Sequence, residues 1–253
     1  MKFKLFTLLF AIVALATVVR AEDTSALTVT YYHYPPDIMV NGGKPSGRYI
    51  DALEAIVSGA GYRVHWMASS IDDEANILDD GRRVICTTGR MPTAERAAKW
   101  YFLPFQFDVV AGDIVLTLPE LKDRIKMHGH ISKLVRNSSL TGTLLESGIY
   151  GAEVDTFIST NPGWILRTGT TDFQLMNMLL AGRAHYTIVP ENQWLEAQKM
   201  LPRTNHLVAI PDFGTHPPYP IAIACSKALS TDMRTRLTDA MAQLEYPRLD
   251  IPK

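Results

Sequence analysis

The sequence predicts an α/β protein built from two successive units. Three observations support this prediction. Strand-like and helix-like segments alternate along the chain, helical segments carry apolar residues on one face, and one more strand and helix follow the second unit. Strands that alternate with helices are typical of mostly parallel sheets, because each crossover helix returns the chain to the end of the sheet where the next strand begins.

The first unit contains three strands and three helices. β-Branched and aromatic residues at 27–32 indicate a strand. Ile50, Leu53 and Ile56 fall on one helical face, and Gly59 ends that pattern. The expected segments are strands at 27–32, 62–67 and 84–88, and helices at 48–59, 71–80 and 93–99.

The second unit repeats the alternation. Its best local signal is a capping box in which Thr171 and Gln174 each satisfy a backbone N–H, opening a helix that is expected to bury Phe173, Met176, Leu179 and Leu180. The expected segments are strands at 108–118, 140–145 and 186–189, helices at 152–159, 172–182 and 193–200, and a helical or irregular stretch at 121–135.

A last strand at 220–225 and a helix at 233–244 follow. If this strand rejoins the first sheet, the chain crosses twice between the units, and two crossings make a hinge with a cleft beside it. We therefore expect lobe 1 to comprise 22–112 and 214–253, and lobe 2 to comprise 113–213.

The first residues resemble a cleavable secretory signal. Lys2 and Lys4 precede an apolar run from Leu5 to Val19, and cleavage is expected after Ala21. The alternative is an uncleaved anchor, but the run is shorter than the ~20 residues needed to cross a bilayer. The expected location is the periplasm, with 1–21 as signal peptide.

The charge and the cysteines exclude several classes of protein. The 25 Lys+Arg and 26 Asp+Glu give a net charge of −1 without basic runs, which argues against nucleic acid as a partner. No spacing of His and Cys indicates a metal site, and we expect no cofactor. Cys86 and Cys225 are interpreted as two buried thiols, although an oxidising compartment also permits a bridge between them.

Four segments resemble the family 3 extracellular solute-binding proteins, the periplasmic receptors for amino acids and related solutes. They lie at 34–53 (beginning Tyr-Pro-Pro), 89–105 (containing Thr-Ala-Glu-Arg), 179–186 (Leu-Leu-Ala-Gly-Arg) and 219–227, in the family's order. The resemblance implies a two-lobed, type II periplasmic-binding-protein-like fold. Each lobe would be a mixed, mostly parallel sheet flanked by helices, and the chain would make two hinge crossings.

The resemblance also implies ligand-binding residues in lobe 1. Arg96 matches the arginine that holds the ligand's carboxylate, a role that suits a planar guanidinium. Tyr34 matches an aromatic residue that stacks on the ligand, and Gly89 and Met91 match positions that contact it. The alternatives are a surface arginine paired with an acid, and a tyrosine packed against other aromatic residues.

In lobe 2, the loop from Ser147 to Gly151, which includes Tyr150, matches one whose N–H groups help to bind the carboxylate. The aspartate with which the family pairs the ligand's ammonium group falls on Pro190 here, and Glu191 is the candidate replacement. A surface role for Glu191 is the alternative.

The expected function is capture of a small, carboxylate-bearing ligand by lobe closure, by a monomer that delivers the ligand to an ABC permease. One alternative is a sensor that docks on a membrane receptor. The other is an enzyme similar to the periplasmic cyclohexadienyl dehydratases, in which Glu191 or Glu146 would act as acid or base. We expect binding rather than catalysis.

Overall fold

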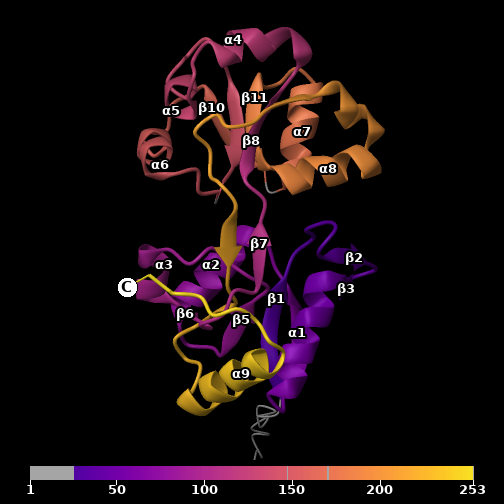
Figure 1. Ribbon diagram of the computed structural model, residues 1–253, viewed down its shortest axis with the longest axis vertical. Coiled ribbons are helices and arrows are strands. Elements are labelled where there is room, and N and C mark those ends of the chain that lie inside the picture. Colours follow the sequence, from indigo (N-terminus) through magenta and orange to yellow (C-terminus); the bar gives the residue numbers. More distant parts are fainter. Residues whose placement is uncertain (1–25, 147, 170, 253) are drawn as a thin grey trace, which may run out of the picture.

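Two lobes, each built around its own sheet, make up the chain in the computed structural model (Figure 1). The structure describes residues 26–146, 148–169 and 171–252. The expected signal peptide at 1–21 lies outside the described residues. No helix in the described part of the chain is long and apolar enough to cross a membrane.

The sheet of lobe 1 has the strand order β4-β1-β5-β14-β6. β1 pairs in parallel with β4 and β5, and β14 pairs antiparallel with β5 and β6. The strands of this sheet are β1 (Ala26–Tyr31), β4 (Arg63–Ala68), β5 (Ile85–Thr87), β6 (Tyr101–Phe102) and β14 (Ala224–Cys225). The helices of lobe 1 are α1 (Arg48–Gly59), α2 (Ile71–Asp80), α3 (Ala94–Lys99) and α9 (Thr231–Gln243). A small hairpin joins β2 (Met39–Asn41) to β3 (Lys44–Ser46).

The predicted apolar faces position these elements. On α1 the predicted face is buried, with Leu53 and Ile56 at 1% and 0% exposure. Burying a side chain of this size stabilises the fold by about 1.5–3 kcal/mol. Gly81 ends α2 in a left-handed conformation, and Thr93 caps α3 by accepting the N–H of Arg96. The Thr93 cap fixes the start of α3, the helix that carries Arg96.

The sheet of lobe 2 has the order β10-β9-β11-β8-β12 and is also mixed, with two parallel and two antiparallel pairings. Strands β10 and β12 were not predicted. The strands of this sheet are β8 (Asp113–Thr117), β9 (Gly142–Leu145), β10 (Ile165–Gly169), β11 (Tyr186–Pro190) and β12 (Val208–Ile210). The helices of lobe 2 are α4 (Lys122–Lys126), α5 (Ile131–Leu134), α6 (Ala152–Ile158), α7 (Asp172–Leu180) and α8 (Glu191–Met200). Short 3-10 turns lie at Pro119–Leu121 and Pro202–His206.

The chain crosses between the lobes twice, along two strands that pair with each other (Figure 1). The segment expected as one strand at 108–118 is divided into β7 (Asp108–Val110) and β8, because β7 pairs with β13 (Tyr219–Ile221) whereas β8 joins the lobe 2 sheet. Gly112 lies at this division, and a Cβ there would lie 3.1 Å from Pro218 Cδ. The second crossing brings the chain back to β14 in lobe 1.

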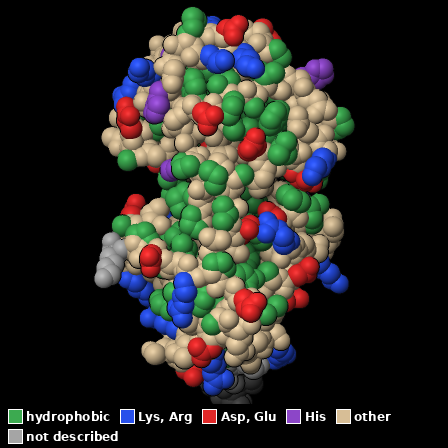
Figure 2. Space-filling view, viewed as in Figure 1, with side chains coloured by type: hydrophobic (Ala, Val, Ile, Leu, Met, Phe, Trp, Pro, Cys, Tyr) green, Lys and Arg blue, Asp and Glu red, His purple; other side chains and the backbone are tan. Residues whose placement is uncertain are grey.

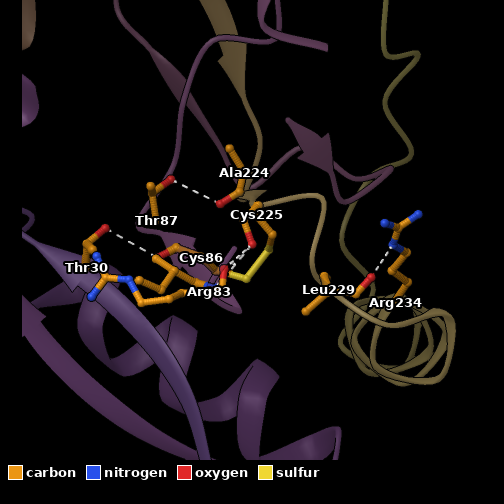
Figure 3. The surroundings of a disulfide bond; sticks show 10 residues. Thr30, Arg83, Cys86, Thr87, Ala224, Cys225, Leu229 and Arg234 are labelled. Atoms are coloured by element: carbon orange, nitrogen blue, oxygen red, sulfur yellow. Dashed lines mark hydrogen bonds between the residues drawn. A yellow bond between two sulfur atoms is a disulfide. The ribbon is translucent and has the colours of Figure 1, made fainter. Parts of the chain in front are cut away.

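The preferred interpretation of the cysteines was wrong, because Cys86 and Cys225 form a disulfide (Figure 3). Cys86 lies on β5, and Cys225 lies directly opposite it on antiparallel β14. This register follows from the return of the chain to the first sheet, and it places both side chains in the lobe 1 core.

Candidate functional site

A cavity of about 140 Å³ lies between the lobes, and side chains of both lobes line it. Lobe 1 contributes residues between 32 and 96, together with the crossing residues Val110, Tyr219 and Ile221. Lobe 2 contributes Asp113 and residues between 145 and 190. The outline of the molecule narrows between the two lobes in Figure 2. This arrangement permits a small ligand to contact both lobes at once.

Five of the residues predicted to bind a ligand line this cleft, namely Tyr34, Gly89, Met91, Arg96 and Tyr150. Ser147 lies outside the described residues. Glu191 is the first residue of α8 and is exposed, and the lining on that side ends at Pro190. The geometry therefore does not bring Glu191 to the cavity as a substitute for the missing ammonium-binding aspartate.

Arg96 presents a positive charge to the cleft from α3. Its Nη1 donates a hydrogen bond to the carbonyl of Met91 at 3.2 Å, and its guanidinium lies 5.5 Å from the ring centroid of Trp100. No carboxylate of the described residues lies within ion-pair distance of it. Burial, and then the nearby charge of Arg90, lower the pKa of Arg96 to about 10. Arg96 therefore remains charged at neutral pH, and an anion placed beside it would offset the cost of burying that charge.

Arg90 is a second guanidinium in the cleft wall, but its charge is already balanced. It forms a buried ion pair with Glu74, a residue of α2 with no exposed surface, and Nη2 also donates to the carbonyl of Ile71 at 3.1 Å. No role was predicted for Arg90, and its pairing with Glu74 could not be read from the spacing of the two residues. Arg90 therefore supports the wall, while Arg96 offers its charge to a ligand.

Tyrosines line much of the cavity. Tyr32 and Tyr34 pack edge to face with ring centroids 5.9 Å apart, and Tyr219 of the second crossing also lines the cavity. Burial raises the pKa of Tyr32 to about 12, and burial also raises the pKa of Tyr34 well above its usual range. These hydroxyls are neutral at physiological pH and can donate hydrogen bonds.

Two N–H groups of the loop before α6 already have hydrogen-bond partners within the protein. The N–H groups of this loop were expected to bind the ligand's carboxylate, but the N–H of Tyr150 donates to Asp155 Oδ1 at 3.0 Å and that of Gly148 donates to the Leu145 carbonyl at 3.3 Å. The Tyr150 hydroxyl in turn accepts the N–H of Leu145 at 2.8 Å. These two N–H groups are thus bonded to Leu145 and to Asp155 of α6, and the loop presents the Tyr150 ring to the cleft.

Two carboxylates in lobe 2 were missed by the sequence analysis. Asp113 begins β8, Asp172 begins α7, and both line the cleft although they are only 8% and 4% exposed. Burial raises the pKa of each to about 7, and the charge of Asp172 contributes to the shift of Asp113. The sequence places Asp172 in a capping box, where aspartate is common for local reasons, so nothing marked it as buried.

Several solved structures are similar to this chain over most of its length. ArtJ, an arginine-, lysine- and histidine-binding protein from Geobacillus stearothermophilus, matches with a TM-score of 0.69 at 15% identity, over 87% of this chain and 89% of that chain. An ancestral amino acid-binding protein, a precursor of cyclohexadienyl dehydratase, matches with a TM-score of 0.65 at 17% identity, over 87% and 90%. This chain has the fold of the periplasmic amino-acid-binding proteins.

The predicted two-lobed α/β fold is therefore confirmed. The same fold occurs in a histidine kinase sensor domain with similarity to periplasmic binding proteins, which matches with a TM-score of 0.66 at 18% identity, over 87% of this chain and 90% of that chain. No protein-family model matches the sequence. No curated protein matches it either. At these identities the structural likeness identifies the fold, and the function has to be argued from the cleft.

Proposed function

We propose that this chain is a periplasmic solute-binding protein that captures a small carboxylate-bearing ligand by closing its lobes. The observation that supports this most is Arg96, a guanidinium that lines the cavity between the lobes and has no carboxylate partner in the described part of the chain. A bidentate bond to a ligand carboxylate would satisfy it.

The paired crossings supply the mechanical part of the proposal. β7 and β13 connect the lobes side by side, so small changes of backbone angle between 110 and 113 and between 215 and 219 would move one lobe as a body. The lobe boundaries at 112 and 214 belong to this proposal. A ligand that contacts Arg96 on one lobe and Tyr150 on the other would favour the closed state, because only that state makes both contacts.

The first experiment is a thermal-shift screen of the mature protein against amino acids, organic acids and dipeptides. A ligand that binds only the folded state raises Tm by mass action. Arg96→Ala is expected to abolish the shift, whereas Arg82→Ala, a change at an 84% exposed arginine of the same lobe, is expected to preserve it. An unchanged shift in Arg96→Ala would remove this residue from the proposed site.

Delivery to an ABC permease is part of the proposal, and a sensor role is the second candidate because of the likeness to a histidine kinase sensor domain. The neighbouring genes distinguish them, since a transporter needs a permease and an ATPase, and a sensor needs a membrane receptor.

Catalysis is less well supported. Glu146 and Glu191, which the sequence offered as acid or base, are both exposed and do not line the cavity. Turnover of prephenate by the purified protein would overturn the proposal that the protein only binds its ligand.

A further inference from the structure

The two walls of the cleft carry opposite charges. Lobe 1 offers Arg96, and lobe 2 offers Asp113 and Asp172. We propose that Asp113 and Asp172 form a cation subsite that binds an ammonium or guanidinium group of the ligand whose carboxylate Arg96 holds. The inference rests on the proposed function for the carboxylate end of that ligand, and it adds the chemistry of the other end.

The burial of Asp172 is the first observation that supports this subsite. Only 4% of the residue is exposed, and its Oδ1 has no hydrogen-bond partner among the residues that the structure describes. Asp113 is 8% exposed, and no Lys, Arg or His forms an ion pair with either aspartate within the described ranges of the chain. Buried carboxylates are normally paired, because an unpaired charge away from water is costly. A ligand cation would supply the missing partner.

The surroundings of Asp172 favour an organic cation over a metal ion. Tyr34, Tyr150 and Tyr219 line the same cavity as Asp172, and the charge of Asp172 adds to the burial that raises the pKa of each tyrosine. Aromatic rings attract ammonium and guanidinium groups. Among the described residues no cluster of three or more His, Cys, Asp and Glu side chains is arranged to hold a metal. Calcium and magnesium need more oxygen ligands than these two aspartates offer.

The positions of the charges define the ligand class. A carboxylate on the Arg96 side and a cation on the aspartate side describe a small zwitterion or a cationic amino acid. Because Glu74 already balances Arg90, the cleft has one available positive group and two negative ones, which favours a ligand of zero or positive net charge. The cavity of about 140 Å³ limits the ligand to roughly amino-acid size.

Isothermal titration calorimetry at about pH 8 tests this inference with named probes. L-Arginine, L-lysine and 5-aminopentanoate carry both charges, pentanoate carries only the carboxylate, and 1,5-diaminopentane carries only cations. At least one of the first three is expected to bind more than about tenfold tighter than pentanoate. Asp172→Asn is expected to weaken that binding by about 30-fold or more and to leave the affinity for pentanoate unchanged.

Asp113→Asn is the second variant, because a single substitution can fail to fold. Asp123→Asn is the matched control, since it makes the same chemical change at an exposed position of lobe 2. Both cleft variants are expected to lose affinity for the two-charge probes, and the control is expected to keep it. Wild-type affinity for those probes in the two cleft variants would overturn the cation subsite.

The outcomes separate this inference from the proposed function. If pentanoate binds and the three two-charge probes bind no better, the subsite is refuted and Arg96 keeps its role. If no carboxylate-bearing probe binds through Arg96, but 1,5-diaminopentane binds and Asp172→Asn abolishes that binding, the proposed function fails and the subsite stands. Failure of every cation-bearing probe to bind overturns the subsite.

Discussion

Replacing Asp172 by asparagine should stabilise the ligand-free protein at pH 8. Burial raises the pKa of this carboxyl from 3.8 to about 7. Each pKa unit is equivalent to about 1.4 kcal/mol, so the ionised group costs the folded state on the order of 4 kcal/mol. A buried asparagine amide that lacks a partner costs about 1–3 kcal/mol in its place. The net gain expected for Asp172→Asn is therefore about 1–3 kcal/mol at pH 8.

The gain should depend on pH with a definite sign. Because the folded pKa lies above the unfolded one, the folded state holds a proton between pH 3.8 and about 7 that the unfolded state has lost. The free-energy cost of burying the Asp172 carboxylate is therefore absent below pH 3.8. It grows as the pH rises from 3.8 to about 7 and is complete above that pH. The variant should match or fall below the wild type at pH 4 and exceed it at pH 8.

Differential scanning calorimetry of the ligand-free protein measures this effect. A gain of 1 kcal/mol raises Tm by roughly 2–4 °C in a chain of this size, so the expected increase at pH 8 is on the order of 2–12 °C. The neighbouring tyrosines have raised pKa values and stay neutral across the range, which leaves Asp113 as the coupled group. Asp123→Asn is the control. An equal Tm change at pH 4 and pH 8, or no increase at pH 8, would refute the reasoning.

Three other predictions concern the lobes themselves. Replacing Cys86 and Cys225 together by alanine should lower the free energy of unfolding by about 2–5 kcal/mol, measured by urea denaturation. Gly148→Ala should lower both Tm and ligand affinity, because a Cβ there would lie 2.4 Å from the Tyr150 hydroxyl and displace that ring from its bond to the loop. Glu74→Gln should destabilise lobe 1 by about 3–5 kcal/mol, since it removes the carboxylate from a buried arginine.

Each of these has an outcome that would contradict it. Wild-type urea unfolding in the double alanine variant would mean that the bridge contributes nothing to stability. A Gly148→Ala protein with normal ligand affinity would show that Tyr150 can move without effect on the cleft. A neutral Glu74→Gln substitution would mean that the buried pair contributes little. The exposed ion pair of Arg82 with Asp80 serves as the comparison for that last test, because exposed pairs contribute about 0–1 kcal/mol.

The sequence predicted the fold better than the chemistry of the site. Arg96 and Tyr34 were found because they stand in segments that resemble a known family, and such segments keep their order along the chain. Strand β10 was missed because its short stretch lacks a clear alternating pattern, and the break between β7 and β8 was not recognised because the residues on both sides of Gly112 are typical of strands.

The two cleft aspartates could not be found by pattern. Asp172 stands in the first turn of α7, where an acid is favoured by the helix dipole whether it is exposed or buried. Asp172 is buried in a cleft whose lining comes from residues far apart in the sequence, which no local pattern shows. The preference for two thiols over a disulfide was wrong for a similar reason, since the pairing of β14 with β5 is a property of the folded sheet.

The bridge between Cys86 and Cys225 has a consequence for the molecule as a whole. The bonded residues are 139 positions apart, and all of lobe 2 lies between them in the sequence. A protease that cuts a surface loop of lobe 2 would therefore produce two fragments that the disulfide still joins. These fragments should run as one band on a denaturing gel without reductant. Lobe 2 can therefore be cut or locally unfolded while the disulfide keeps the two segments of lobe 1 covalently joined.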